Sequence, residues 1–229
     1  MTLNERHSSI LEILKKNRTA DVKRLSESLF VSEATIRRDL KELQTLGLIE
    51  RSHGGAILAD NAEEVSIFVR MAKNAKAKEQ IATNALPLIP EFRSVFIDSS
   101  STALALAGRM DLSFKTIVTN NLQTALQLSK NETVNLILLG GNVQFSSVSS
   151  TGSWTARQLE EFKFDLMIFS CSAVTDGVAY ERSLDQKEIK ISALKRSKYK
   201  ILLVDKTKFN TDGTHKITNL DDLDLVVTD

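Results

Sequence analysis

Cysteine, proline and aromatic residues are scarce in this sequence. Its 229 residues include one cysteine, two prolines and 6% aromatic residues. The lone Cys171 excludes an intramolecular disulfide, and one cysteine with three scattered histidines leaves no spacing typical of a metal site. We therefore expect no disulfide framework, no bound metal and no other cofactor.

Long apolar runs and a large net charge are also missing. No run approaches the ~18 apolar residues that a membrane span needs, and the start, MTLNERHSSI, lacks a basic-then-apolar signal pattern. The formal net charge of +1 argues against a protein that coats nucleic acid through bulk charge, so any DNA contact must come from local clustering. We expect a cytoplasmic protein without a membrane partner.

The remaining composition is typical of a globular chain, and its length predicts two domains. Residues 1–58 are predicted to form a winged helix-turn-helix domain, residues 59–74 a helical connector, and residues 75–229 an α/β domain. In the last part, apolar runs such as SVFID, TIVTN and YKILLVD alternate with helix-like stretches. Runs that are apolar on both faces and separated by helices indicate a mostly parallel sheet covered by helices.

The first 58 residues predict three helices followed by a hairpin. The segment ERHSSILEILKKN carries one apolar stripe, typical of an amphipathic helix. Thr19 is predicted to cap a second, short helix that buries Val22, Leu25 and Leu29. Ser32 is predicted to cap the third.

The third helix, residues 33–46, separates apolar from basic side chains. At ~100° per residue, one side carries Ile36, Leu40 and Leu43. The opposite side carries Ala34, Arg37, Arg38, Lys41 and Thr45. Gly47 suits the left-handed position that ends a helix. The segment LGLIERSHGGAIL then predicts two short strands around a Gly-Gly turn, which is a wing.

Two helices joined by a tight turn, the second basic and facing outward, match the geometry that places a recognition helix in the major groove. Arg37 and Arg38 are the best candidates for reading guanine, and the sequence does not say which of them does. Gly54 and Gly55 would let the wing tip approach a phosphate closely. The competing interpretation is a solvated amphipathic helix with a hairpin behind it. The predicted DNA contacts are Ser32, Ala34, Thr35, Arg37, Arg38, Lys41, Arg51, His53 and Gly54.

Polar residues follow almost every apolar run of the second part. Ligands of open parallel sheets lie at the carboxyl ends of the strands. The Ser/Thr-rich loop DSSST offers hydroxyls and free N–H groups to a phosphate, with lysines as opposing charge. Alternatively, the serine run only caps a helix and the Gly-Gly pair only turns the chain. The predicted effector-binding residues are Asp98, Ser99, Ser100, Ser101, Thr102, Asn120, Gly140, Gly141, Lys206 and Lys208.

The segment VSEATIRRDLKELQTLGLIERSHGGA, with the later DSSST and DKTKF, resembles the DeoR family of bacterial transcriptional repressors across essentially the whole chain. The resemblance implies a winged-helix head on double-stranded operator DNA, and a sensor domain similar to sugar-phosphate isomerases that binds a phosphorylated sugar. A homodimer or homotetramer is expected because each head reads a short half-site. The positions that match the family's sensor motifs are Asp98, Ser101, Thr102, Asn120, Gly140, Gly141, Asp205 and Lys208.

Three departures from the family pattern stand out. Ser100 replaces a loop glycine, which puts a Cβ where the backbone usually approaches the ligand. Gln144 follows the Gly-Gly pair without the arginine often found there. The sequence stops at VVTD, where relatives commonly run on, which suggests a truncated C-terminus.

Three functions from different classes follow. The first is a repressor whose operator affinity changes when a sugar phosphate binds. The second is an isomerase-like enzyme carrying a DNA-binding head, for which an acidic base is needed. The third is a redox sensor at Cys171, against which stands the interpretation of a buried, inert thiol. Trp154 and Phe162 are predicted to be core residues of one helix. The conceivable bases are Asp98, Asp176, Glu181 and Glu188.

Overall fold

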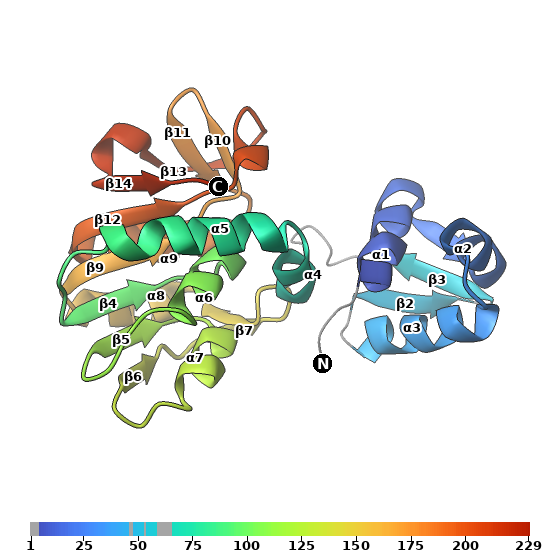
Figure 1. The fold of residues 1–229 in the computed structure, drawn as a ribbon, viewed down its shortest axis with the longest axis horizontal. Coiled ribbons are helices and arrows are strands. Elements are labelled where there is room, and N and C mark those ends of the chain that lie inside the picture. The colour runs from blue at the N-terminus through green and yellow to red at the C-terminus, as the bar shows by residue number, and fades with distance from the viewer. Residues whose placement is uncertain (1–4, 46–47, 53, 59–65) are drawn as a thin grey trace. The chain divides into compact units, whose positions relative to one another are not determined.

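The computed structural model describes residues 5–45, 48–52, 54–58 and 66–229, in two compact units, Met1–Lys73 and Asn74–Asp229. The first unit contains α1 (Glu5–Asn17), β1 (Thr19–Asp21), α2 (Val22–Leu29), α3 (Glu33–Thr45), β2 (Ile49–Ser52), β3 (Gly55–Leu58) and α4 (Ile67–Ala72). Its strands form an antiparallel sheet in the order β1-β3-β2. Helices α2 and α3 form the helix-turn-helix and β2-β3 the wing (Figure 1).

The core of the first unit is formed by the apolar stripes of its helices. Ile10 and Leu14 of α1 pack with Leu25 of α2, and Ile36 and Leu40 of α3 complete the cluster, all fully buried. These residues recur at the three- and four-residue spacing of one helix face, so burial of the stripe fixes how each helix is rotated. The outward face of α3 is thereby determined.

The start of α2 differs from the prediction. Thr19 does not cap this helix, because residues 19–21 pair with β3 as a third strand and stay extended. Asp21 is the cap instead, and its carboxylate accepts a hydrogen bond from the Arg24 backbone N–H at 2.7 Å. Val22 and Leu25 are buried as predicted, whereas Leu29 is only partly buried. Gly47 lies outside the described residues.

The predicted connector, residues 59–74, is described from residue 66 onward. Ser66 caps α4 by accepting a hydrogen bond from the Phe68 N–H. The helix ends at Ala72, where Lys73 is extended, and Asn74 has a left-handed φ of 54° just before α5 begins. A single continuous helix through residue 74 is therefore not formed.

The second unit is built on a six-stranded parallel sheet in the order β14-β12-β9-β4-β5-β6. The strands are β4 (Ser94–Ile97), β5 (Thr116–Thr119), β6 (Asn135–Leu138), β9 (Phe164–Phe169), β12 (Ser197–Leu203) and β14 (Leu225–Val227). The helices are α5 (Ala75–Ala85), α6 (Ser101–Ala107), α7 (Leu122–Leu128), α8 (Ser153–Gln158) and α9 (Leu184–Arg196). A winged helix-turn-helix followed by a mostly parallel α/β unit confirms the predicted fold class.

Alternate residues of the central strands face two separate cores. Val95 and Ile97 of β4 belong to the cluster that α5, α6 and α7 cover, whereas Phe96 between them belongs to the cluster under α8 and α9. Both faces are therefore buried, which explains why the strand sequences are apolar throughout. Short 3₁₀ turns cover Leu86–Leu88, Leu159–Glu161, Lys206–Lys208 and Leu220–Asp222.

Two small antiparallel elements flank the main sheet. One is a sheet in the order β10-β11-β13, and the other is the hairpin β7-β8. Their bounds are β7 (Asn142–Gln144), β8 (Ser149–Thr151), β10 (Ala173–Thr175), β11 (Val178–Glu181) and β13 (His215–Asn219). Both elements contribute side chains to the site described below.

The prediction for Trp154 was wrong. Its side chain lies on α8 but is 64% exposed, because this six-residue helix packs inward through Thr155 and the following turn through Leu159. Phe162 follows that turn and stacks on Phe164, with ring centroids 5.7 Å apart. Among the described residues, no helix is long and apolar enough to cross a membrane.

Candidate functional site

The predicted DNA-reading surface begins with the cap of α3. The Ser32 hydroxyl accepts a hydrogen bond from the Thr35 N–H at 3.2 Å and is 2.9 Å from the Thr35 hydroxyl. Ser32 and Thr35 therefore fix the start of the helix, and Ala34 between them is exposed. Ile36, Leu40 and Leu43 are buried as predicted, which turns the basic face outward.

The two adjacent arginines of α3 differ in their partners. Arg37 forms an ion pair with Glu33 one turn earlier, at 2.7 Å, and its backbone carbonyl accepts a hydrogen bond from Arg51 of the wing at 3.5 Å. Arg38 and Lys41 are exposed, and their side chains have no hydrogen-bond or ion-pair partner in the described part of the chain. These two cations are thus available to an external anion.

The wing glycines have different roles. Gly54 is exposed with a φ of +80°, and a Cβ there would meet nothing within 4 Å. Gly55 is buried, and a Cβ there would lie 2.3 Å from the carbonyl oxygen of Ala20. Close packing against β1 therefore requires glycine at 55, whereas Gly54 is the glycine exposed at the wing tip. His53, also predicted to contact DNA, lies outside the described residues.

Arg6 and Asp39 anchor the recognition helix from behind. Asp39 is 1% exposed, and both its carboxylate oxygens accept hydrogen bonds from the Arg6 guanidinium, at 2.5 and 2.9 Å. Burial of Asp39 opposes its ionisation, but the Arg6 hydrogen bonds and charge outweigh burial and hold the pKa of this carboxyl below its ordinary value. The pair ties α1 to α3, a role that sequence reasoning missed because these residues are far apart in the chain.

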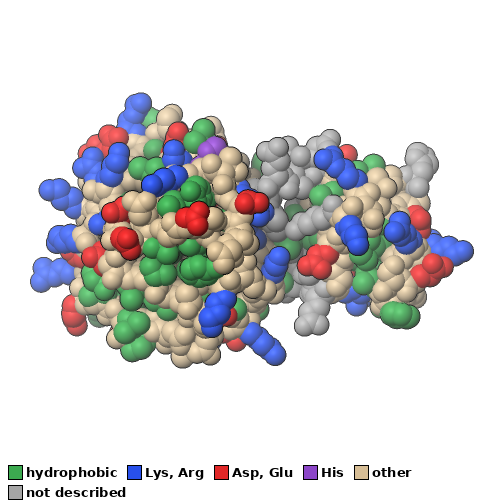
Figure 2. Space-filling model, turned by 90° about the horizontal axis from the view of Figure 1, so that it is seen from above, with side chains coloured by type: hydrophobic (Ala, Val, Ile, Leu, Met, Phe, Trp, Pro, Cys, Tyr) green, Lys and Arg blue, Asp and Glu red, His purple; other side chains and the backbone are tan. Residues whose placement is uncertain are grey.

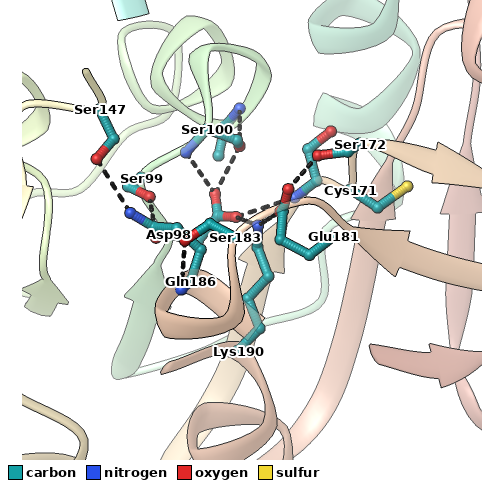
Figure 3. A network of polar contacts seen from close by, with 12 residues as sticks. Asp98, Ser99, Ser100, Ser147, Cys171, Ser172, Glu181, Ser183, Gln186 and Lys190 are labelled. Carbon is teal, nitrogen blue, oxygen red and sulfur yellow. Dashed lines mark hydrogen bonds and ion pairs between the residues drawn. The ribbon is translucent and has the colours of Figure 1, made fainter. Parts of the chain in front are cut away.

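The loop after β4 is organised around buried Asp98 (Figure 3). One carboxylate oxygen accepts hydrogen bonds from the Ser100 N–H at 3.0 Å and the Ser100 hydroxyl at 2.5 Å. The other accepts from the Ser170 N–H, at 3.2 Å, at the end of the neighbouring strand β9. Ser100 also caps α6 by accepting from the Ala103 N–H at 3.2 Å. The serine that departs from the family pattern therefore supplies a helix cap.

A buried lysine lies against this loop. Lys190 of α9 is 4% exposed. Its ammonium group is 3.4 Å from the Asp98 carboxylate and forms a hydrogen-bonded ion pair with Glu181 of β11. Burial opposes ionisation of Glu181, but Lys190 and the bond from Ser172 hold the pKa of this carboxyl well below its ordinary value. Lys190 was not predicted. The available signal was its place on the buried face of α9, beside Ile189 and three residues before Ala193.

Gln186, one turn before Lys190, joins three parts of the site (Figure 3). Its amide oxygen accepts from the Ser99 hydroxyl at 2.7 Å, and its amide nitrogen lies 3.0 Å from Ser147 and 2.9 Å from Ser149. Gln144 of the same hairpin is 3.1 Å from that nitrogen. The segment 144–149 thus packs over the loop after β4, where the sequence drew attention only to Gln144 and to the two glycines before it.

The predicted residues Gly140 and Gly141 shape the hairpin's entry. The Gly140 carbonyl accepts from Thr155 at 2.8 Å, and a Cβ at Gly141 would meet the Thr155 hydroxyl at 2.0 Å. Glycine is needed at 141 because its φ is +150° and α8 packs against it.

The two predicted lysines have different surroundings. Lys208 donates to the Ser170 hydroxyl at 3.1 Å and to the Cys171 carbonyl at 2.8 Å, next to Asp98. Lys206 is exposed, and its backbone N–H bonds Asp229 instead. The structure therefore brings Lys208, but not Lys206, to the loop after β4.

Three polar atoms near this edge are fully enclosed and have no hydrogen-bond partner among the residues that the structure describes. They are Thr102 Oγ1, Asn120 Oδ1 and Thr124 Oγ1, in residues that are at most 1% exposed. Asn120 follows β5, the strand next to β4, and the threonines begin α6 and α7. Thr124 was not among the predicted site residues.

Cys171 is a buried thiol, which agrees with the interpretation that it is inert and not with that of a redox sensor. Burial raises the pKa of Cys171 to about 11, although Lys208 and Lys190 act in the opposite direction. Within the ranges that the structure describes, no group of three histidine, cysteine, aspartate or glutamate residues is placed to hold a metal ion.

Two family models together match most of the chain. Residues 6–62 match the DeoR-like helix-turn-helix domain, and residues 73–229 match the DeoR C-terminal sensor domain. Among solved structures, ribose 5-phosphate isomerase A from Neisseria gonorrhoeae is 15% identical, with a TM-score of 0.42 over 58% of this chain and 53% of that one. The eIF2B delta subunit from Chaetomium thermophilum is 13% identical, with a TM-score of 0.48 over 69% and 57%.

Full-length relatives are more similar. The HTH-type transcriptional regulator GolR of Listeria innocua is 35% identical over 98% of this chain and 90% of its own length. The L-fucose operon activator of Escherichia coli is 34% identical over 98% and 94%, and its glycerol-3-phosphate regulon repressor 32% identical over 100% and 92%. Because these relatives are transcriptional regulators, the isomerase-like enzyme hypothesis is set aside. The chain belongs to the DeoR family of transcriptional regulators, with a DeoR-like helix-turn-helix domain followed by a DeoR C-terminal sensor domain.

Proposed function

We propose that the chain is a transcriptional repressor of a sugar-metabolism operon, regulated by a phosphorylated sugar bound at the carboxyl edge of the parallel sheet. The observation that carries this proposal is the separation of two chemistries into two compact units. One unit exposes unpaired cations on a recognition helix, and the other gathers buried polar side chains where a parallel sheet binds ligands.

The DNA contact rests on local charge. Figure 2 shows Lys and Arg side chains interspersed with Asp and Glu on the visible face, in keeping with a net charge of +1. Arg38 and Lys41 depart from this balance because no acidic side chain of the described residues neutralises them. Arg38 is the better base reader, since Arg37 is held by Glu33, and Lys41 is placed for backbone phosphate.

The sensor proposal rests on Lys208 and the serine loop. The Lys208 ammonium donates two hydrogen bonds beside Asp98 and lies 3.8 Å from the Asp205 carboxylate, beyond hydrogen-bond distance, so a third donor remains that suits a phosphate oxygen. Ser101 adds a further hydroxyl at the start of α6. The name of one relative, the glycerol-3-phosphate regulon repressor, refers to a phosphorylated polyol. Another is the lactose phosphotransferase system repressor of Lactococcus lactis, 34% identical over this whole chain.

Regulation then follows from linkage. An effector that binds the DNA-free form more tightly lowers operator affinity, and DNA lowers effector affinity by the same factor. Two heads of a homodimer or homotetramer would read two half-sites, so a change in their spacing suffices to release the operator. The glycerol-3-phosphate and lactose relatives are repressors by name and the L-fucose relative is an activator, which favours repression as the role of this chain.

The test is a fluorescence-anisotropy titration of the chain on its own promoter DNA with and without ribose 5-phosphate, fructose 6-phosphate or glycerol 3-phosphate. At least one sugar phosphate should lower DNA affinity at least fivefold, and inorganic phosphate should not. Lys208→Met should abolish this response while leaving DNA affinity intact, whereas Lys206→Met should retain it. A DNA affinity that no sugar phosphate changes would contradict the sensor role, and tighter binding would make the chain an activator or a corepressed repressor.

A further inference from the structure

One stretch of the second unit has no charged side chain. Residues 133–156 contain no aspartate, glutamate, lysine, arginine or histidine, although 26% of the chain is charged. This uncharged stretch covers the strand β6, the hairpin β7-β8 and the start of α8. The centres of protein–protein contacts are depleted of charge and enriched in aromatic residues relative to the rest of a protein surface. The uncharged stretch therefore has the composition of a contact surface.

Large apolar side chains of the uncharged stretch are exposed. They are Leu138 of β6, Val143 and Phe145 of the hairpin, and Trp154 of α8. Val143 points to the outer side of the hairpin, because its neighbour Gln144 points inward and bonds the buried Gln186. Singly exposed apolar residues are ordinary, whereas a group of them on adjoining elements marks an interaction site.

Hydrogen bonds hold these elements next to one another. The Gln158 side-chain nitrogen donates to the carbonyl oxygens of Gly140 and Trp154, at 2.9 and 3.1 Å. Gly140 lies between Leu138, where β6 ends, and Asn142, where the hairpin begins. The Trp154 backbone is therefore beside the junction of β6 and the hairpin, and the exposed residues belong to one region.

Strand β6 has an open edge. It is the last strand of the parallel sheet, and no strand of the described residues pairs with its outer side (Figure 1). The Asn135 and Leu139 N–H groups bond carbonyl oxygens on the β5 side, at 3.0 and 2.9 Å. Because backbone groups alternate in direction along a strand, those of Leu136 and Leu138 point to the open side. Soluble proteins normally protect such an edge with charge or proline, and β6 has neither.

A second copy of the chain fits this edge better than an unlike partner. Two antiparallel β6 strands related by a two-fold axis at Ile137 place Leu136 opposite Leu138 of the second copy, where the two residues exchange hydrogen bonds. A two-fold contact also brings side chains near their own counterparts, so any charge would meet a like charge. The uncharged stretch avoids this repulsion, and it offers no charge by which an unlike partner could be selected.

We propose that two copies of the chain join through the uncharged stretch, with their β6 strands paired antiparallel and Leu138, Val143 and Trp154 covered by the contact. The inference rests in part on the proposed function, because two half-sites of an operator require two heads. The open edge and the missing charge support it independently of DNA and effector.

The test places a charge in the contact. Leu138 is 45% exposed in the single chain, so Leu138→Lys should fold, as judged by circular dichroism. The dimer dissociation constant from sedimentation equilibrium should rise at least about tenfold. A tetrameric wild type should fall to dimers by the same change. Leu88→Lys is the matched control: Leu88 is 50% exposed in the same unit but lies outside the uncharged stretch, so its replacement should leave assembly unaltered.

Two further measurements locate the contact. An equimolar mixture of Leu138→Lys and Leu138→Glu should associate again, because the two positions are diagonal neighbours across the paired strands and then carry opposite charges. Trp154 is the only tryptophan, so its emission should shift to longer wavelength when the wild-type dimer dissociates on dilution. Leu138→Lys should show the emission of the monomer at concentrations where the wild type is dimeric.

Assembly that survives Leu138→Lys unchanged, or dissociation without a change in Trp154 emission, places the contact elsewhere and overturns the inference. A monomeric wild type also overturns it, since the uncharged stretch then has another occupant. If Leu138→Lys does not fold, Val143→Lys on the hairpin replaces it with the same expected results. These measurements use neither DNA nor a sugar phosphate. A chain that dimerises as described but ignores every sugar phosphate therefore refutes the proposed function alone.

Discussion

Removal of the buried ammonium group at Lys190 should destabilise the sensor unit in a pH-dependent way. Lys190→Met leaves Asp98 and Glu181 enclosed without their cation. Asp98 keeps hydrogen-bond donors on both oxygens, from Ser100 and Ser170. Glu181 keeps Ser172 and Arg182 on Oε1 but loses the Lys190 donor from Oε2, so Glu181 is the carboxyl that we expect to take up a proton. A buried charge left unpaired typically costs about 3–5 kcal/mol, unless the group neutralises itself.

Proton uptake sets the magnitude. The ordinary pKa of glutamate is 4.5, which is 2.5 units below pH 7. Protonating Glu181 at pH 7 therefore costs the free energy of 2.5 pH units. At ~1.4 kcal/mol per unit, Lys190→Met should lower the free energy of unfolding by about 3.4 kcal/mol at pH 7 and by only about 0.7 kcal/mol at pH 5. The variant should thus become more stable as the pH falls from 7 to 5. The wild-type chain should instead lose stability as the pH falls below 4.5. The pKa of Glu181 in the folded chain lies below that value, so its stabilising charge is lost as the pH falls further.

Urea unfolding at pH 7 and pH 5, followed by far-UV circular dichroism and by tryptophan emission, measures both values. Trp154 is the only tryptophan and lies in the second unit, so its emission reports that unit. Lys198→Met is the matched control, because Lys198 pairs with Asp165 at 2.8 Å but its side chain is 76% exposed; its loss should cost at most ~1 kcal/mol. A loss below about 1 kcal/mol at pH 7 for Lys190→Met, or an equal loss at both pH values, would refute the reasoning.

Three further predictions concern the first unit. Arg38→Ala should weaken operator binding by about 1–3 kcal/mol and relax the base preference at one position in a selection from random DNA. Lys41→Ala should instead weaken binding to all DNA sequences alike and reduce the salt slope by about one. Equal losses for Arg38→Ala on operator and random DNA would contradict its base-reading role. Asp39→Asn should lower the unfolding free energy of this unit by about 2 kcal/mol in thermal melts, since a charge-assisted pair with Arg6 is lost; an unchanged melt would oppose this. Gly55→Ala should displace β3 from the Ala20 carbonyl and cost about 1–3 kcal/mol, unlike an exposed substitution elsewhere in the wing.

Local periodicity explains what could be predicted. Ile36, Leu40 and Leu43 recur at the spacing of one helix face, and burial of that face leaves Arg38 outward whatever the rest of the unit does. Likewise, strands that are apolar on both faces require cover on both sides, which restricts the sheet to a parallel one under helices. The loop after β4 could be chosen as a candidate site because ligands of open parallel sheets bind at the carboxyl ends of the strands.

Contacts between distant segments were not predictable, since no local pattern records them. Arg6 reaches Asp39, and Thr19 joins a sheet with β3 instead of capping a helix. Trp154 is large and apolar, like many core residues, but it lies on the outer side of a short helix because Thr155 and Leu159 occupy the inner side. For Arg6 and Thr19 the partner lies outside the window in which periodicity operates.

The sequence by itself determined the two-domain organisation, the outward face of the recognition helix and the family, because these depend on spacing within short segments. Only the tertiary structure decided which charges are free and which polar atoms are enclosed. It paired Arg37 with Glu33, enclosed Lys190 between Asp98 and Glu181, and left the Thr124 hydroxyl without a partner among the described residues. The physical reason is that desolvation and hydrogen bonding depend on every element packed around a side chain, which the order of residues along one segment does not specify.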